Sequence, residues 1–370
     1  MHVRRRRSPG WCGTWSYRPL PKHPLRSLPS NSHIELSGAN AILVGDVGGT
    51  HARFAIVDAS GLAPWHIRQR QDLDEDFPTF SAALRSYFER AKVTAVPATA
   101  AIAVAGPVTQ GTAQFTNRGW QISEEELKKI GFTDALLIND FAALAFAVEV
   151  LDESGLRTLG PELSRLDQGT ISILGAGTGF GVSCLARHGD RVVPMATEGG
   201  HVGFAPSDDE ELAVLHALWK QFGRVSIERI LSGPGLENLY RTLEQLGGRE
   251  APALTAAQIV ARATNNEANC RAALMMFCSI YGAVAGDFAL AHGARGGVYI
   301  AGGIAQKIEG FLAQSSFRTR FESKGRLSPF VAAIPTKLIV NPDAALLGAA
   351  RAGVVLASGA GTIPRQDSPH

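Results

Sequence analysis

A carboxylate inside an apolar stretch is the first feature with chemical meaning. In Asp134–Val150, DALLINDFAALAFAVEV, apolar and small residues flank Asn139-Asp140 on both sides, and the stretch contains no lysine or arginine. One member of the pair suits the N-cap of a helix that follows a strand. The other would remain at the carboxyl end of that strand, where α/β sheets bind their ligands. The sequence leaves open which of the two residues caps the helix.

Three glycine turns, each after a buried apolar strand, have the composition of phosphate-binding loops. They are Asp46–Thr50 (DVGGT), Gly175–Gly179 and Gly302-Gly303, the last of which opens a helix. Glycine lets backbone N–H groups approach a phosphate, and a helix N-terminus favours an anion. Thr50 adds a hydroxyl donor, and Asp46 suits the water shell of Mg²⁺. One such turn fits an ordinary hairpin equally well, whereas three together favour phosphate binding. Neither a Walker A loop nor a Rossmann fingerprint occurs.

Polar residues elsewhere could bind a hydroxyl-rich ligand. Glu198-Gly199-Gly200-His201 brings a carboxylate and an imidazole together on one loop, and such groups aimed at one place suit a sugar. Asn117 and Trp120 share a second polar segment, and Glu228 precedes the turn LSGPG. Structural roles compete with this interpretation. A tryptophan beside a helix start more often packs, and Glu228 alone is better explained as a solvated helix residue.

The order of apolar runs and turns predicts an α/β chain. AILVGDVGGTHARFAIVD reads as a strand hairpin, and a second hairpin has strands flanking Gly175–Gly181. Ser123 with Glu126 three residues later predicts a capping box, and Asp343 is expected to start the last helix. The other predicted helices span 77–92, 208–222, 235–246, 255–264 and 267–292. Two glycine hairpins of one style indicate two related halves.

Charge and composition exclude several classes of protein. The 370-residue chain has a formal net charge of +2, but residues 1–34 hold seven Lys/Arg and no acid, which leaves a body of 29 basic and 34 acidic residues. A net acidic body does not fit nucleic-acid binding. Four cysteines form no CxxC pair, so we expect no disulfide framework or zinc site, and a reducing cytosol fits. The sequence contains no run of 18 apolar residues, so no membrane span is predicted.

The basic N-terminal segment stands apart from this body. Residues 1–38 are rich in Pro, Ser and Arg without periodicity, so we expect a disordered tail. No apolar segment follows the arginines, which argues against a secretory signal. A transit peptide and a start codon assigned too early are the two remaining interpretations of this segment.

Eight segments in order resemble the bacterial-type glucokinase family, which transfers a phosphoryl group from ATP to the 6-hydroxyl of glucose. They are DVGGTHARFAIVD, AVAGPV, TNRGWQIS, LINDFAALAFAV, LGAGTGFGVSCL, TEGGHVGFAP, ERILSGPGLENLYR and VYIAGGIA. The resemblance implies an α/β, two-lobed actin-like ATPase (ribonuclease H-like) fold, each lobe a mixed sheet flanked by helices. Residues 39–140 would form the smaller lobe, to which a helix over about 343–358 returns, and residues 141–342 the larger lobe.

The resemblance also implies roles for the residues singled out above. Asp140 would be the catalytic base. The glucose-binding residues would be Asn117, Asn139, Asp140, Glu198, His201 and Glu228. The ATP-binding residues would be Asp46, Gly48, Gly49, Thr50, Gly177, Thr178, Gly302 and Gly303, with Mg²⁺ held through water on Asp46. The family further implies ATP and Mg²⁺ as cofactors, a cytoplasmic enzyme of glycolysis, and often a homodimer. The chain departs from its relatives at Gly203, where many carry an acid.

Three alternatives to glucose phosphorylation stay open at the level of the sequence. The first is a kinase of another hexose or an acylamino sugar. The second is an actin-like, nucleotide-switched binding protein, which needs the ATP loops but not the sugar residues. The third is a sugar-sensing repressor of the related ROK group, although residues 1–40 are too short and too rich in proline for a winged-helix domain. The cysteine-rich zinc motif of ROK kinases is also missing.

Overall fold

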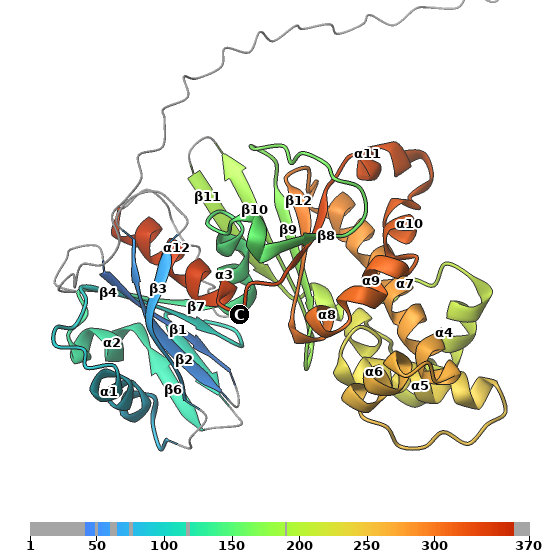
Figure 1. Ribbon diagram of the computed structural model, residues 1–370, viewed down its shortest axis with the longest axis horizontal. Coiled ribbons are helices and arrows are strands. Elements are labelled where there is room, and N and C mark those ends of the chain that lie inside the picture. Colours follow the sequence, from blue (N-terminus) through green and yellow to red (C-terminus); the bar gives the residue numbers. More distant parts are fainter. Residues whose placement is uncertain are drawn as a thin grey trace, which may run out of the picture. The chain divides into compact units, whose positions relative to one another are not determined.

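The computed structural model describes residues 41–48, 51–59, 65–73, 77–115, 119–188 and 191–358, which fold around two mixed β-sheets (Figure 1). The first sheet has five strands in the order β3-β2-β1-β4-β7. These strands are β1 (Ala41–Val47), β2 (Ala52–Asp58), β3 (His66–Leu73), β4 (Thr99–Val104) and β7 (Asp134–Asn139). β1, β2 and β3 pair antiparallel, while β1, β4 and β7 pair parallel.

The second sheet has six strands in the order β11-β10-β9-β12-β13-β8 (Figure 1). They are β8 (Leu156–Thr158), β9 (Ile171–Ala176), β10 (Phe180–His188), β11 (Arg191–Thr197), β12 (Gly297–Ala301) and β13 (Thr336–Ile339). β9, β10 and β11 pair antiparallel, and β9, β12 and β13 pair parallel. Each sheet thus joins a three-stranded meander to two parallel strands, which is the repeated layout that the two glycine hairpins predicted, and the second sheet adds β8, antiparallel to β13. A separate ribbon pairs β5 (Thr112–Phe115) with β6 (Trp120–Ser123).

The helices lie close to the predicted positions, with several differences. They are α1 (Phe80–Arg90), α2 (Glu124–Ile130), α3 (Asp140–Ala147), α4 (Asp209–Phe222), α5 (Gly233–Leu246), α6 (Ala256–Thr264), α7 (Ala268–Ala291), α8 (Gly303–Lys307), α9 (Glu309–Gln314), α10 (Phe317–Glu322), α11 (Ser328–Ala332) and α12 (Ala344–Ala357). The predicted 77–92 helix starts only at Phe80, because Thr79 caps it by accepting a hydrogen bond from the Ala82 N–H. Gly175 and Gly181 lie inside β9 and β10, so the second glycine turn is narrower than expected.

Two predicted helix starts differ in their side-chain contacts. The Ser123 hydroxyl accepts from the Glu126 N–H at 3.0 Å, but the Glu126 carboxylate accepts a hydrogen bond from Ser81. Only half of the predicted capping box is therefore formed. Asp343 lies at the N-cap of α12 without capping it through its side chain, because its carboxylate pairs with Arg70 on β3.

Three apolar clusters fill the space around the sheets. One lies between α1, α2 and the first sheet, and a second joins the second sheet to α4, α5, α6 and α7. The third combines residues of both sheets with α3 and α12. By length and composition α7 could cross a membrane, although Arg271 and Asp287 interrupt its apolar run. However, 67% of its most apolar stretch is buried, and it packs against α5, α6 and α10 as a core helix.

Candidate active site

The structure shows which of Asn139 and Asp140 caps the helix and which remains at the end of the strand. The Asn139 Oδ1 atom accepts hydrogen bonds from the N–H groups of Phe141 and Ala142, at 3.0 and 3.2 Å, so Asn139 is the N-cap of α3. Its side-chain nitrogen donates to the Asp140 carboxylate at 3.0 Å and to the Gly106 carbonyl oxygen at 3.2 Å. The Asp140 carboxylate also accepts from the Phe141 N–H, at 2.9 Å. Because Asn139 alone suffices for the cap, the helix does not require a carboxylate at position 140.

The Asp140 carboxyl group has a strongly raised pKa. The residue is half-buried, and no lysine or arginine of the described residues forms an ion pair with it. Burial, and next the negative charge of Asp46, raise the pKa of Asp140 from 3.8 to about 7, against the opposing hydrogen bonds from Phe141 and Asn139. A carboxyl group that titrates near neutral pH can accept a proton from a substrate and release it again.

Asp46 lies near the end of β1, and β4 separates β1 from β7 in the same sheet. Its hairpin partner is Arg53, whose Nη1 atom is 3.6 Å from the Asp46 Oδ2 atom. Burial raises the pKa of Asp46, while Arg53 acts in the opposite direction. The structure thus places the Arg53 guanidinium beside the Asp46 carboxylate. The parallel strands β1, β4 and β7 thus bring Asp46 and Asp140 together at their carboxyl ends.

Phe141 attaches the Asp140 segment to the second glycine hairpin. A Cβ atom added to Gly175 or Gly181 would lie only 2.6 or 2.1 Å from the Phe141 ring, so both glycines are needed to make room for it. The Ser183 hydroxyl donates to the Phe141 carbonyl oxygen at 3.0 Å. These contacts fix the backbone next to Asp140 on β9 and β10. Sequence reasoning missed them, although the glycines inside the strands were a visible signal of close approach.

The second and third glycine turns lie side by side. Gly302 has a φ of +89°, and a Cβ atom there would meet the Ala176 carbonyl oxygen at 2.4 Å, so only glycine fits. Gly177 and Gly303 have no atom within 4 Å of an added Cβ, which leaves space for a ligand beside both residues, while the Gly177 N–H is bonded to the Gly179 carbonyl oxygen at 2.8 Å. The Gly233 N–H donates to the Gly177 carbonyl oxygen at 2.8 Å. This arrangement fits backbone approach to a phosphate chain.

The third turn opens a helix, as predicted, but that helix is short. The helix that Gly302-Gly303 opens, α8, has five residues. A helix of little more than one turn aligns few peptide dipoles and so offers little field to an anion. Any contribution of this turn to nucleotide binding must therefore come from its open backbone.

Three of the residues expected to read a sugar, Glu198, His201 and Glu228, lie on segments that contact the first residue of β10. Glu228, on the turn Ile227–Arg229, accepts a hydrogen bond from the Phe180 N–H at 2.9 Å through its Oε2 atom. On the other side of Phe180, a Cβ atom on Gly200 would lie 2.0 Å from the Phe180 carbonyl oxygen. The Glu198-His201 segment therefore packs against the start of β10, where Glu228 forms its hydrogen bond.

Glu198 and His201 themselves are exposed. Their Oε2 and Nε2 atoms are 3.8 Å apart, as the two intervening glycines predicted, and the side chains are 82% and 59% exposed. The Ile227 N–H donates to the Val202 carbonyl oxygen at 2.9 Å, which ties this segment to the one that carries Glu228. The structure thus brings Glu198, His201 and Glu228 into one neighbourhood.

The remaining predicted residues have separate outcomes. Gly49, Thr50 and Asn117 lie outside the described residues. The Gly48 N–H donates to the His51 carbonyl oxygen at 2.9 Å and so closes the tip of the first hairpin. Trp120 is buried, and its indole N–H donates to the Phe77 carbonyl oxygen at 2.8 Å, which is the packing role that the sequence favoured.

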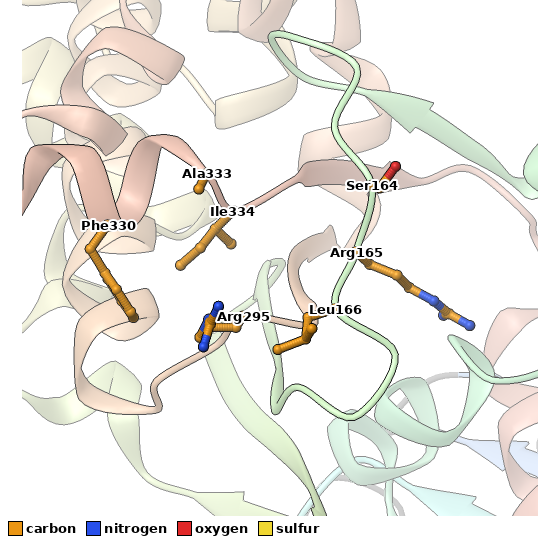
Figure 2. A pocket seen from close by; sticks show the side chains of 7 residues that line it. All are labelled: Ser164, Arg165, Leu166, Arg295, Phe330, Ala333 and Ile334. Atoms are coloured by element: carbon orange, nitrogen blue, oxygen red, sulfur yellow. The ribbon is translucent and has the colours of Figure 1, made fainter. Parts of the chain in front are cut away.

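Two further observations concern metal-ligand clusters and cavities. Among the described residues, no cluster of three or more His, Cys, Asp or Glu side chains could hold a metal ion. One cavity has a volume of about 210 Å³, but no candidate site residue lines it (Figure 2). Its lining residues are Ser164, Arg165, Leu166, Arg295, Phe330, Ala333 and Ile334.

Comparison with known proteins identifies the family. The sequence profile of the glucokinase family matches residues 43–354. A glucokinase of Caulobacter sp. (strain K31) is 47% identical over 319 residues, which are 85% of this chain and 96% of the relative. The chain belongs to the glucokinase family. Its activity is therefore that of a glucokinase, phosphorylation of glucose.

Solved glucokinase structures share this fold. The crystal structure of a glucokinase from an Antarctic psychrotroph has a TM-score of 0.79 and 35% identity, and the match covers 85% of this chain and 99% of that one. A ROK family glucokinase from Streptomyces griseus, in complex with glucose and AMPPNP, matches with a TM-score of 0.57 and 17% identity over 85% of this chain and 99% of that one. The predicted actin-like, two-lobed α/β fold is confirmed.

Proposed function

We propose that this glucokinase transfers the γ-phosphoryl group of ATP to the 6-hydroxyl of glucose, with Asp140 as the general base, giving glucose 6-phosphate and ADP. The observation that carries the assignment is the Asp140 carboxyl group itself. It is half-buried, lacks a cationic partner among the described residues, and has a pKa of about 7. A structural carboxylate at this position would gain stability from a partner, whereas a base must exchange its proton with the substrate.

In the proposed reaction Asp140 takes the proton of the 6-hydroxyl as that oxygen forms its bond to the γ-phosphorus. The bond between the γ-phosphorus and the β–γ bridging oxygen breaks at the same time, and ADP leaves with the electron pair. The residue Asn139 orients the carboxylate through its 3.0 Å hydrogen bond. General-base assistance of this kind contributes about 10²–10⁴ in rate.

Glucose would be bound by groups that surround Phe180 and by the pair at the end of β7. These are Asn117, Asn139, Asp140, Glu198, His201 and Glu228. Glu198 and His201 are exposed and can reorient toward ring hydroxyls. A wrong epimer would leave one of these groups unpaired in a site closed to water, at a cost of about 1–3 kcal/mol. That cost would give the enzyme its preference among hexoses.

The phosphates of ATP would lie along the glycine turns. The contributing residues are Gly48, Gly49, Thr50, Gly177, Thr178, Gly302 and Gly303. The open space above Gly177 and Gly303 supports this placement. Asp46 would hold Mg²⁺ through water, and the absence of a larger cluster of acidic and histidine ligands in the described chain fits an ion bound mainly by phosphate and water. Bound to the phosphates, Mg²⁺ would neutralise charge as the γ-phosphoryl group is transferred.

The compartment and the oligomeric state of the enzyme are further parts of the proposal. We propose a cytoplasmic homodimer. Cys184, Cys270 and Cys278 are free and buried, and burial raises the pKa of the Cys278 thiol to about 12. Thiols of this kind are unreactive and fit a reducing compartment, although they do not depend on one.

A coupled assay of ADP production tests the proposed function. Glucose, mannose, fructose and N-acetylglucosamine are compared at saturating MgATP. We expect glucose to give the largest kcat/KM, and the ATPase rate without sugar to be small. A larger kcat/KM with another sugar would assign the chain to that sugar. A rate that no sugar changes would favour a nucleotide-switched protein.

A further inference from the structure

The backbone of Phe180 connects the sugar side of the site with the nucleotide side. Phe180 is the first residue of β10 and directly follows the turn Gly177–Gly179. Its N–H is bonded by the Glu228 Oε2 atom at 2.9 Å, and its carbonyl oxygen lies against Gly200 of the Glu198-His201 segment. On the sugar side, Glu228 therefore bonds the N–H of the residue that ends the phosphate turn, and Gly200 packs against the carbonyl oxygen of that residue.

We propose that Glu228 is a positioning residue that couples occupancy of the sugar site to the shape of the phosphate turn. This inference rests on the proposed function, in which Glu228 binds glucose. One carboxylate oxygen, Oε2, is bonded to the turn through Phe180. The other, Oε1, makes no hydrogen bond with the described residues, so it is available to a sugar hydroxyl. A single rigid carboxylate thus links the two ligands.

The opposite side of the turn is already fixed. The Gly177 carbonyl oxygen accepts from the Gly233 N–H at 2.8 Å, at the start of α5. The α5 cap is in turn connected to Glu228, because the Ser232 hydroxyl donates to the Glu228 carbonyl oxygen at 2.8 Å. Holding the Glu228 side chain with a sugar hydroxyl restricts a second anchor of the turn, the bond to Phe180. The turn then needs less ordering when phosphate binds, which is the physical origin of the coupling.

Thermodynamic linkage makes the coupling reciprocal. If glucose raises the affinity for the nucleotide by some factor, the nucleotide raises the affinity for glucose by the same factor. Couplings between sites in proteins are typically about 5- to 150-fold. We therefore expect glucose to lower the Kd of MgAMPPNP by about fivefold or more in the wild-type enzyme.

Two glycines of the turn provide a matched pair of variants. A Cβ atom on Gly179 would lie 2.5 Å from the Glu228 Oε2 atom, so Gly179→Ala pushes the carboxylate away from Phe180 without altering Glu228 itself. A Cβ atom on Gly177 meets nothing within 4 Å, so Gly177→Ala stiffens the same turn without touching Glu228. Because the coupling is a ratio of two Kd values, a direct effect of either methyl group on nucleotide binding cancels.

The experiment is calorimetric titration of the full chain with MgAMPPNP, with and without saturating glucose. We expect Gly179→Ala to reduce the wild-type coupling to less than about twofold, and Gly177→Ala to retain it. Equal coupling in Gly179→Ala and wild type would overturn the inference, as would equal loss in both variants. An active wild type with no coupling would overturn it too, while leaving the proposed function intact.

A second measurement needs no substitution. Hydrogen exchange of the peptide that contains Gly177–Phe180 is followed in the wild-type enzyme with glucose alone. We expect glucose to slow exchange there, because the Phe180 N–H is the donor to Glu228. Unchanged exchange in an enzyme that phosphorylates glucose would refute the coupling. Failure of the wild type to phosphorylate glucose would instead refute the proposed function.

Discussion

Replacing Asp140 with asparagine should make the protein more stable at neutral and alkaline pH. In the folded state the pKa of Asp140 is raised from 3.8 to about 7, chiefly by burial and then by Asp46. The folded state therefore holds a proton that the unfolded state releases, so wild-type stability falls as the pH rises between about 4 and 7. Asparagine never becomes charged, and its side-chain oxygen can still accept from the Phe141 N–H. The stability of the Asp140→Asn variant should therefore not fall with this titration.

The magnitude follows from the shift in pKa. Three pKa units at about 1.4 kcal/mol each amount to about 4 kcal/mol once Asp140 is fully ionised, near pH 8. The same linkage gives about 2 kcal/mol at pH 5 and less than about 1 kcal/mol at pH 4. The stability advantage of Asp140→Asn over wild type should therefore grow steadily with pH across this window.

Urea unfolding at pH 5, 6, 7 and 8 measures this advantage. Asp167→Asn is a suitable control, because the Asp167 side chain is 88% exposed and its charge is solvated in both states. The control should show no gain that depends on pH. If the stability difference between Asp140→Asn and wild type is the same at pH 5 and pH 8, Asp140 is not a carboxyl group destabilised by burial. A variant less stable than wild type at pH 8 would refute the reasoning outright.

Two other perturbations test the surroundings of Asp140. Asp46→Asn removes the neighbouring negative charge that raises the Asp140 pKa, so the acid limb of the pH profile of kcat/KM should move to lower pH; an acid limb that stays in place would show that Asp46 exerts no such effect. Gly181→Ala places a Cβ atom 2.1 Å from the Phe141 ring and should cost about 1–3 kcal/mol of stability, measured by urea unfolding, together with part of kcat. Gly203→Ala is its control, because a Cβ atom there meets nothing within 4 Å, and equal effects of the two substitutions would contradict the proposed packing.

The sequence predicted the hairpins and the strand ends that carry chemistry because these depend on local signals. Glycine turns between apolar runs mark the β1–β2 and β9–β10 hairpins, and both are present. The polar pair after an apolar strand marks the end of β7. By contrast, β3, HIRQRQDL, was not predicted, since it is a half-exposed edge strand without apolar alternation. The short helices over 309–332 lack a full period of the helical pattern and were also missed.

The contacts within the site could be predicted only in part. Types and spacing identified Asp140, Glu198 and His201 as candidates. Glu228 bonds the phosphate turn and also lies near the sugar residues. This position depends on how the short 3₁₀ helix Ile227–Arg229 packs against β10, which no local sequence pattern encodes. The packing of Phe141 between two glycines depends in the same way on two strands approaching α3. Such tertiary contacts become visible only once the fold is known.

The central claim, that Asp140 is the base, is tested most directly by the kcat of Asp140→Asn at saturating glucose and MgATP. The loss of general-base assistance should lower kcat by about 10²–10⁴, while the Kd for glucose changes by only a few-fold, since Asn139 and the groups around Phe180 remain in place. A folded variant that keeps more than about a tenth of the wild-type kcat would contradict the assignment.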